Sequence, residues 1–224
     1  MPFQDRSEAG RKLAIGLSVY KDQRPVVLAL PRGGVAVAAE VARLLDAPLD
    51  LVLVRKIGVP FQPELAMGAV VDGPNPLVVR NEEVIQLSGI SEADFAAVRD
   101  NELNEIQRRR SRYLGGRAHP NLSGRIAIVV DDGVATGATT RAALLAVRAQ
   151  EPKQVILAVP VAPTSTLAEL RGVADDIVCL EDHEPFYAIG AYYRDFRQVS
   201  DQEVIDILAR FPAESPGVPK VSTG

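Results

Sequence analysis

Residues 125–140 have the sequence RIAIVVDDGVATGATT, and this stretch decides the fold. Its five apolar residues, Ile126–Val130, do not alternate with polar residues, which is typical of a strand buried on both faces of a parallel sheet. Asp131 and Asp132 end the strand, and a loop rich in glycine and threonine leads into residues 141–149, whose apolar positions have helical spacing. Free N–H groups at the start of such a helix favour a bound anion. The stretch therefore predicts an anion site on a strand–loop–helix unit.

This loop lacks the motifs of two common phosphate sites, which limits the anions that it can be expected to bind. No lysine precedes Thr139 or Thr140, so the spacing does not match the phosphate loop of nucleoside triphosphatases. The chain also lacks the Gly-x-Gly-x-x-Gly pattern of a dinucleotide-binding site, so such a site is disfavoured. Carboxylates repel phosphate but accept hydrogen bonds from sugar hydroxyls. A ligand whose phosphate is carried by a ribose with a vicinal diol therefore suits both halves of the stretch. The alternative, an ordinary capped helix after a strand, explains one Asp or Thr but not the whole set.

The composition of the chain bounds its class. The 224 residues are 47% hydrophobic and 24% charged, which fits one globular α/β domain. The net charge of −4 argues against broad affinity for nucleic acid. A single cysteine excludes internal disulfides and cysteine-based metal clusters. The N-terminus lacks the apolar segment of a signal peptide and no apolar run approaches ~20 residues, so we expect a cytoplasmic protein without a membrane partner.

Two further segments that we interpret as buried strands end in residues suited to anions. Residues 26–30 are followed by Pro31-Arg32-Gly33-Gly34, and residues 49–54 are followed by Arg55 and Lys56. In α/β sheets, ligands bind at the carboxyl ends of the strands. We therefore interpret both motifs as parts of the site. A plain strand–helix turn and exposed charges at a strand end are the alternatives.

The order of elements predicts an α/β fold with a doubly wound parallel sheet, because four strands are each followed by a helix. A hairpin across residues 72–76 and a long polar helix from Ser91 to about Tyr113 interrupt this order. We divide the single domain, residues 1–224, into a core at about 21–182, a helical insertion at about 81–115, a hood at about 183–211 and a flexible tail at 212–224.

The segment VVDDGVATGATT, residues 129–140, resembles the 5-phosphoribosyl-1-pyrophosphate (PRPP) signature of type I phosphoribosyltransferases. The resemblance implies that Asp131 and Asp132 hold the 2′- and 3′-hydroxyls of the ribose. It also implies a loop around the 5′-phosphate, made of Ala135, Thr136, Gly137, Ala138, Thr139 and Thr140. Gly133 stands where the family usually carries an apolar residue, a departure that loosens the loop without removing a contact.

The same resemblance implies a pyrophosphate site. The family places its pyrophosphate loop where this chain has residues 31–34, often with a non-proline cis peptide, which we expect near Arg32–Gly33. Arg32 and the N–H groups of Gly33 and Gly34 would then face pyrophosphate. Arg55 and Lys56 are similar to the basic pair of adenine and orotate phosphoribosyltransferases, which meets pyrophosphate partly across a dimer interface, so a homodimer is implied. The implied cofactor is Mg²⁺ held by PRPP, with the acid pair as the only side-chain candidates.

The hood carries the implied base site. Five of the eleven Phe and Tyr residues fall within residues 184–196. In purine and related phosphoribosyltransferases the corresponding segment stacks an aromatic ring on the base, which makes Phe186 or Tyr187 the base-binding candidate; the alternative is that these rings only anchor the hood. Ala135 replaces the acid that handles the base proton in 6-oxopurine enzymes, so a hypoxanthine-guanine enzyme is disfavoured. The acceptor stays an unassigned nitrogenous base.

The implied activity is transfer of the phosphoribosyl group from PRPP with release of pyrophosphate, whose charge Arg32, Arg55 and Lys56 would neutralise. One alternative is a PRPP-sensing regulator that binds nucleic acid through the arginines at 108, 109, 110 and 112. Glu102 and Glu105 stand at helical spacing from these arginines, which favours a self-paired surface over nucleic acid. A phosphatase or kinase acting on a sugar phosphate is a third reading.

Overall fold

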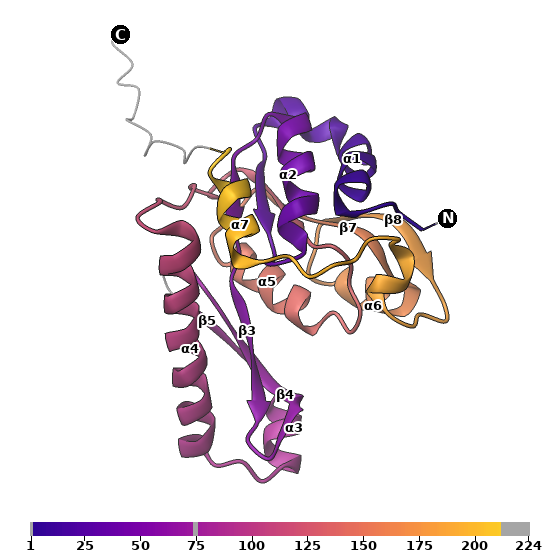
Figure 1. The fold of residues 1–224 in the computed structure, drawn as a ribbon. Coiled ribbons are helices and arrows are strands. Elements are labelled where there is room, and N and C mark those ends of the chain that lie inside the picture. The colour runs from indigo at the N-terminus through magenta and orange to yellow at the C-terminus, as the bar shows by residue number, and fades with distance from the viewer. Residues whose placement is uncertain (1, 74–75, 212–224) are drawn as a thin grey trace.

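The structure is a computed structural model that describes residues 2–73 and 76–211. Its centre is a five-stranded sheet with the order β2-β1-β6-β7-β8 (Figure 1). The strands are β1 (Val26–Ala29), β2 (Leu49–Leu51), β6 (Ile126–Val130), β7 (Gln154–Pro163) and β8 (Asp176–His183). Every pairing is parallel. All five residues of β6 are buried, as expected for a central strand covered on both faces.

Helices cover both faces of this sheet. The helices α1 (Arg6–Gly16), α2 (Gly34–Leu45) and α7 (Asp201–Leu208) share one apolar cluster with Ile128 of β6, whereas α5 (Ala138–Arg148) shares a second cluster with Val129. The short helix α6 (Thr164–Leu170) adds Leu167 and Leu170 to the second cluster. Successive strand residues point to opposite faces, so Ile128 and Val129 belong to different clusters. The doubly wound parallel sheet predicted from the sequence is confirmed.

Residues 54–114 form an arm that projects from the sheet (Figure 1). It contains an antiparallel sheet of β3 (Val54–Val59), β4 (Gln62–Val71) and β5 (Leu77–Arg80), followed by α3 (Glu82–Leu87) and α4 (Glu92–Leu114). The side chains of Ile57, Met67, Phe95 and Ile106 are buried inside the arm. The hairpin across residues 72–76 is confirmed by the pairing of β4 with β5. The helix expected from Ser91 is also confirmed, since the Ser91 hydroxyl accepts a hydrogen bond from the Asp94 N–H at 3.2 Å.

The strand expected at residues 49–54 is wrong in its extent. β2 ends at Leu51, and Val54 already belongs to β3 of the arm. Arg55 and Lys56 therefore lie inside an antiparallel strand and not at the carboxyl end of a parallel one. The apolar run hid this boundary because Val52 and Leu53 are buried although they belong to neither strand.

The hood is joined to the N-terminal segment. It includes the 3₁₀ helix η2 (Ile189–Tyr192) and leads into α7. Phe3 forms a bridge with Tyr193, and the N–H of Arg194 donates to the carbonyl of Phe3 at 2.8 Å. The tail expected at 212–224 lies outside the described residues. Among the residues that the structure describes, no helix is both long and apolar enough to cross a membrane.

Candidate active site

The acid pair and the Arg32 loop meet at one edge of the parallel sheet. Asp131 and Asp132 follow β6, and residues 30–34 follow β1, its neighbour. The N–H of Leu30 donates to the carbonyl of Val130 at 2.9 Å. A Cβ added to Gly33 would collide with the carboxylate of Asp132, so only glycine allows this close approach.

Asp132 is held in a buried ion pair. The residue is 8% exposed, and its Oδ2 accepts a hydrogen bond from Nε of Arg6 at 2.7 Å. Nη1 of Arg6 donates to the carbonyl of Arg197 at 2.9 Å, and the guanidinium lies 4.0 Å from the ring centre of Phe196. The Tyr193 hydroxyl donates to the backbone carbonyl of Asp132 at 2.6 Å. The N-terminal helix and the hood therefore fix the second acid together.

Asp131 is the acid with the perturbed titration. Its Oδ1 accepts a hydrogen bond from the N–H of Asp132 at 2.8 Å. Burial and then the negative charge of Asp132 raise the pKa of Asp131 well above its ordinary value, and the positive charge of Arg6 opposes part of this rise. The two acids therefore differ in their surroundings: Asp132 is ion-paired with Arg6, whereas the pKa of Asp131 is raised.

The loop from Ala135 to Thr140 presents an open surface at the start of α5. Ala135, Thr136, Ala138 and Thr139 are exposed, whereas Thr140 is only 3% exposed. Gly137 caps α5 without a side-chain hydrogen bond, and the N–H of Arg141 donates to its carbonyl at 2.7 Å. The N–H groups before Arg141 precede the hydrogen-bonded part of the helix and are free to bind an anion. Burial of Thr140 removes its hydroxyl from this exposed surface.

The surroundings of Gly133 explain why glycine stands where the family usually carries an apolar residue. A Cβ there would lie 2.5 Å from Cγ2 of Ile189 and 3.1 Å from Cγ1 of Val161. The space that a larger residue would need is filled by the hood residue Ile189. The N–H of Val134 donates to the carbonyl of Val161 at 3.0 Å, and the hydroxyl of Thr166 donates to the carbonyl of Ala135 at 2.8 Å. The loop is thus held by β7 and α6 despite its glycine.

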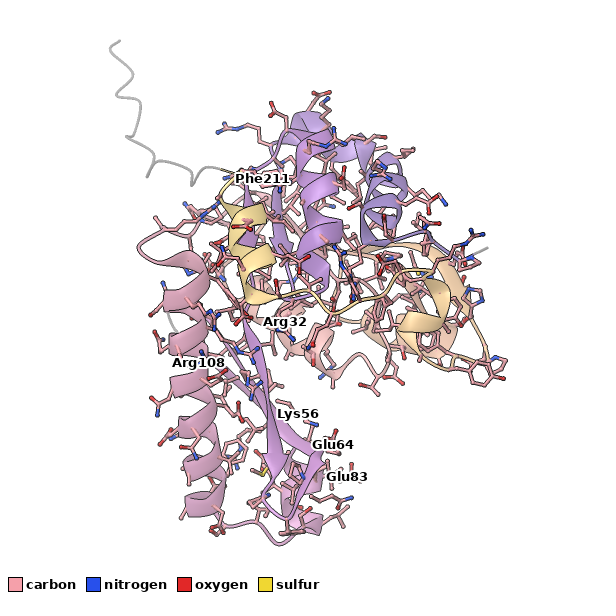
Figure 2. The ribbon with its side chains drawn as sticks, in the orientation of Figure 1. Arg32, Lys56, Glu64, Glu83, Arg108 and Phe211 are labelled. Atoms are coloured by element: carbon pink, nitrogen blue, oxygen red, sulfur yellow. The ribbon has the colours of Figure 1, made fainter. Side chains whose placement is uncertain are left out.

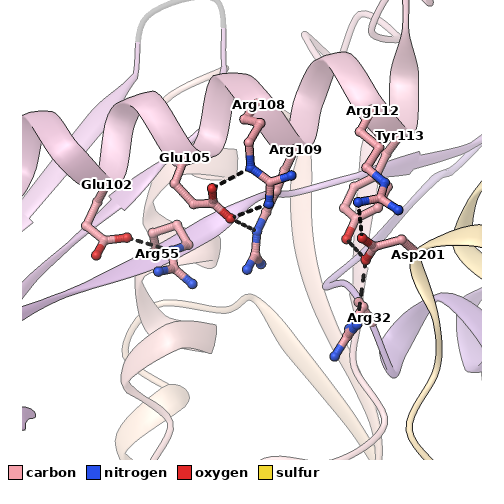
Figure 3. Close-up of polar contacts among 9 residues, drawn as sticks. All are labelled: Arg32, Arg55, Glu102, Glu105, Arg108, Arg109, Arg112, Tyr113 and Asp201. Carbon is pink, nitrogen blue, oxygen red and sulfur yellow. Dashed lines mark hydrogen bonds and ion pairs between the residues drawn. The ribbon is translucent and has the colours of Figure 1, made fainter.

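Arg32 is partly exposed beside the N-terminus of α7. The peptide bond between Pro31 and Arg32 is cis, one bond before the position expected from the resemblance. Nη1 of Arg32 lies 3.6 Å from Oδ1 of Asp201, the first residue of α7 (Figure 3). Asp201 also contacts α4, so the Arg32 loop is linked to the arm as well as to the acid pair.

Arg55 and Lys56 are not brought to the acid pair. Nε of Arg55 donates to Oε2 of Glu102 on α4 at 2.6 Å, and Nζ of Lys56 lies 3.1 Å from Oε2 of Glu64. Figure 2 shows Lys56 on the arm, apart from Arg32 at the sheet. A pocket of about 390 Å³ beside both basic residues is lined by arm residues only.

The arginines of α4 are paired with acids. Glu105 binds both Arg108 and Arg109, at 2.7 and 2.8 Å, which agrees with the self-paired surface expected from their spacing (Figure 3). Glu102 instead binds Arg55, while Arg110 and Arg112 bind acids outside the helix, Arg110 to Asp72 at 3.5 Å and Arg112 to Asp201 at 2.8 Å. These ion pairs compete with any contact to nucleic acid phosphates.

The two base-binding candidates lie in different surroundings. Phe186 stacks on Tyr192 with ring centres 5.1 Å apart, and Tyr192 stacks on His183 at 4.5 Å. Tyr187 is 84% exposed. One face of Phe186 is therefore already covered by the hood, whereas the ring of Tyr187 is open.

Two residues of the site were missed from the sequence. Arg6 shares a helix face with the buried residues Ala9 and Leu13, and a charged residue on that face was a usable signal. Asp201 had no comparable signal, because acidic residues are common in the first turn of any helix.

The structure describes no group of three or more His, Cys, Asp or Glu side chains that could hold a metal ion. Mg²⁺ is commonly bound by one or two carboxylates together with substrate phosphates. The acid pair fits that mode, since Asp131 and Asp132 are adjacent and lie beside the exposed phosphate-type loop.

A family model described as phosphoribosyl transferase domain matches residues 4–196. The match includes the acid pair, the Arg32 loop, the arm and the hood aromatics. The chain belongs to the phosphoribosyltransferase domain family. The resemblance drawn from residues 129–140 is thereby confirmed, and so is the mixed α/β fold that it implied.

Relatives of this phosphoribosyltransferase domain include a protein from two strains of Mycobacterium tuberculosis, which is named provisionally as a phosphoribosyl transferase. This chain and the relative are 49% identical over 208 residues, which cover 93% of this chain and 46% of the relative. The chain thus spans about half the length of the curated relatives it matches. The crystal structure of TT1426 from Thermus thermophilus is 40% identical, with a TM-score of 0.82 over 95% of this chain and 100% of that one.

Proposed function

We propose that the protein transfers the 5-phosphoribosyl group of PRPP to a nitrogenous base and releases pyrophosphate. One observation carries the proposal: the acid pair, the exposed threonine loop and the Arg32 loop adjoin at the carboxyl ends of β1 and β6 within a phosphoribosyltransferase domain.

Each part of the site has a role in this reaction. The free N–H groups and hydroxyls of residues 135–139 bind the 5′-phosphate at the start of α5. Asp131 accepts hydrogen bonds from the ribose hydroxyls, and Asp132 contributes the oxygen that Arg6 does not occupy. The bond from C1 to the pyrophosphate oxygen breaks with both electrons leaving on pyrophosphate. A nitrogen lone pair of the base forms the new bond to C1, and the proton of that nitrogen passes to the released pyrophosphate or to solvent.

The leaving pyrophosphate needs positive charge in its vicinity. Arg32 and the N–H group of Gly33 supply it from the loop after β1. The N–H of Gly34, expected from the sequence to face pyrophosphate as well, instead donates to the carbonyl of Leu30 at 3.1 Å. Mg²⁺ held by PRPP oxygens, with Asp131 and Asp132 as the side chains that could join them, would add charge neutralisation when bound.

A homodimer supplies Arg55 and Lys56 in this proposal. Both lie in β3 of the projecting arm and pair there with Glu102 and Glu64, and Figure 2 shows Lys56 apart from Arg32. A mixing experiment tests this directly: Lys56→Gln and Asp131→Asn, each inactive alone, should regain activity when unfolded and refolded together. Recovery fails if each chain uses its own Lys56, and light scattering shows whether the chain is dimeric.

Tyr187 is the favoured base-stacking residue because its ring is open. Tyr187→Leu should raise KM for the base several-fold without changing the affinity for PRPP. Phe186→Leu should instead lower stability, because its ring packs on Tyr192. Equal effects of Tyr187→Leu on both substrates would contradict a stacking role.

The deciding experiment follows pyrophosphate release from PRPP and Mg²⁺ with a panel of purine and pyrimidine bases. Asp131→Asn should abolish release, while Asp100→Asn, an exposed acid of α4, should retain it. Release of orthophosphate would indicate a sugar-phosphate phosphatase instead. Binding of nucleic acid with a steep salt dependence and no pyrophosphate release would indicate a regulator.

A further inference from the structure

Asp201, which none of the roles above uses, lies between Arg32 and Arg112. Its Oδ2 lies 2.8 Å from Nη1 of Arg112, its Oδ1 lies 3.6 Å from Nη1 of Arg32, and the Tyr113 hydroxyl donates to Oδ1 at 2.6 Å (Figure 3). The Tyr113 hydrogen bond, and then the charges of Arg112, Arg32 and Arg109, lower the pKa of Asp201. One carboxylate thus joins the Arg32 loop, the C-terminal end of α4 and the start of α7.

The charges of this cluster do not balance. Within the described part of the chain, ion pairs link Arg32 and Arg112 to Asp201, and Arg108 and Arg109 to Glu105. Four guanidinium groups therefore share two carboxylates. The part of this deficit at Asp201, where two guanidinium groups share one carboxylate, lies beside the loop proposed to face pyrophosphate. A guanidinium binds phosphate with the same fork of donors that it uses for a carboxylate.

Asp201 is not needed to begin α7. The Ser200 side chain accepts a hydrogen bond from the N–H of Glu203, and the Glu203 side chain accepts one from the N–H of Ser200. This capping box satisfies the helix start, and Val204 and Leu208 provide its buried face. The side chain of Asp201 is 22% exposed, so it can turn away without opening the core.

We propose that Asp201 occupies the place of a phosphate group: it holds Arg32 and Arg112 in the absence of substrate, and the pyrophosphate group of PRPP displaces it. Arg112 is then a further pyrophosphate-binding residue, contributed by the arm. This inference rests on the proposed function, because it takes Arg32 as a pyrophosphate ligand. A pyrophosphate group carries more negative charge than one carboxylate and can contact both arginines at once.

Calorimetry with inorganic pyrophosphate and with ribose 5-phosphate tests the exchange. Asp201→Asn removes the competing charge and should tighten pyrophosphate binding about 1.5- to fivefold, the range of a partly exposed ion pair. Asp206→Asn is the matched control, since it removes the same charge from the same helix at an exposed residue that hydrogen-bonds Gln202. Ribose 5-phosphate affinity should not change in Asp201→Asn, because this ligand lacks the pyrophosphate group.

Arg112→Gln should weaken pyrophosphate binding, while Arg99→Gln, which removes an arginine bound to Asp100 on the same helix, should not. Circular dichroism of each variant establishes that it is folded. The exchange alone would be overturned if the wild type binds pyrophosphate but Asp201→Asn has the same pyrophosphate affinity as Asp206→Asn. The same conclusion would follow if Arg112→Gln has the same affinity as Arg99→Gln. Wild-type protein that binds neither pyrophosphate nor PRPP would overturn the proposed function and this inference with it.

Discussion

Replacement of Arg6 by methionine tests the buried ion pair at the centre of the site. The side chains of Arg6 and Asp132 are only 10% and 12% exposed, so little solvent screens their attraction. Removing one partner of a buried pair typically costs ~3–5 kcal/mol, because the remaining charge is left uncompensated. Methionine keeps an unbranched side chain of similar size but loses the guanidinium, and with it the contact over the Phe196 ring and the hydrogen bond to the Arg197 carbonyl.

We expect a loss of about 3 kcal/mol at pH 7, at the lower end of that range. The reason is Asp131. Its pKa is already raised, and the positive charge of Arg6 limits that rise. Without Arg6, Asp131 takes up a proton more readily and removes part of the excess negative charge. The destabilisation should therefore shrink as the pH falls from 7 towards 5, since protonation then costs less.

Urea denaturation of the wild type, Arg6→Met and the control Arg11→Met provides the measurement. Arg11 lies on the same helix, but its side chain is 53% exposed and its pair with Glu40 is long, at 3.7 Å. Arg11→Met should cost less than ~1 kcal/mol at any pH. If Arg6→Met is no worse than Arg11→Met, or if its loss grows as the pH falls, the ion pair does not act as described.

Three other outcomes follow from single contacts. Tyr193→Phe should cost ~1–2 kcal/mol in urea denaturation, because it leaves a buried carbonyl without its donor; no loss would mean that water replaces the hydroxyl. Asp50 accepts a 2.6 Å hydrogen bond from His119 and raises the pKa of His119. The hydrogen bond therefore stabilises the fold fully below the pKa of His119 in the unfolded chain, about 6.5, and this stabilisation is lost as the pH rises through the higher pKa of the folded chain. The stability of His119→Gln should not show this pH dependence. Gly33→Ala should cost ~1–3 kcal/mol by thermal unfolding and weaken PRPP binding, while Gly116→Ala, with open space around it, should do neither.

The sequence predicted the parts of the fold that depend on neighbouring residues. The apolar run of β6, the helix start at Ser91 and the glycine-threonine loop before α5 each carry their signal within a few positions. The doubly wound order followed from them, because parallel strands need helical crossovers.

The sequence could not reveal pairings between distant residues. Arg6 and Asp132 are 126 positions apart, and their pair exists only because the N-terminal segment joins the hood. Helical spacing placed Glu102 with the arginines of its own helix, but β3 of the arm packs there and supplies Arg55 instead. Arg55 and Lys56 were misplaced for a local reason: the mostly apolar residues 49–54 concealed the point at which the chain leaves the core.

The bridge between Phe3 and Tyr193 also constrains the order in which the molecule can be completed during synthesis. Arg6 emerges from the ribosome 191 positions before the carbonyl of Arg197 that it binds. At typical translation speeds, the first helix waits roughly 10 to 40 seconds for that partner. A nascent chain halted before Tyr193 already contains all five parallel strands. It still lacks the hood residues that hold Arg6 against Asp132.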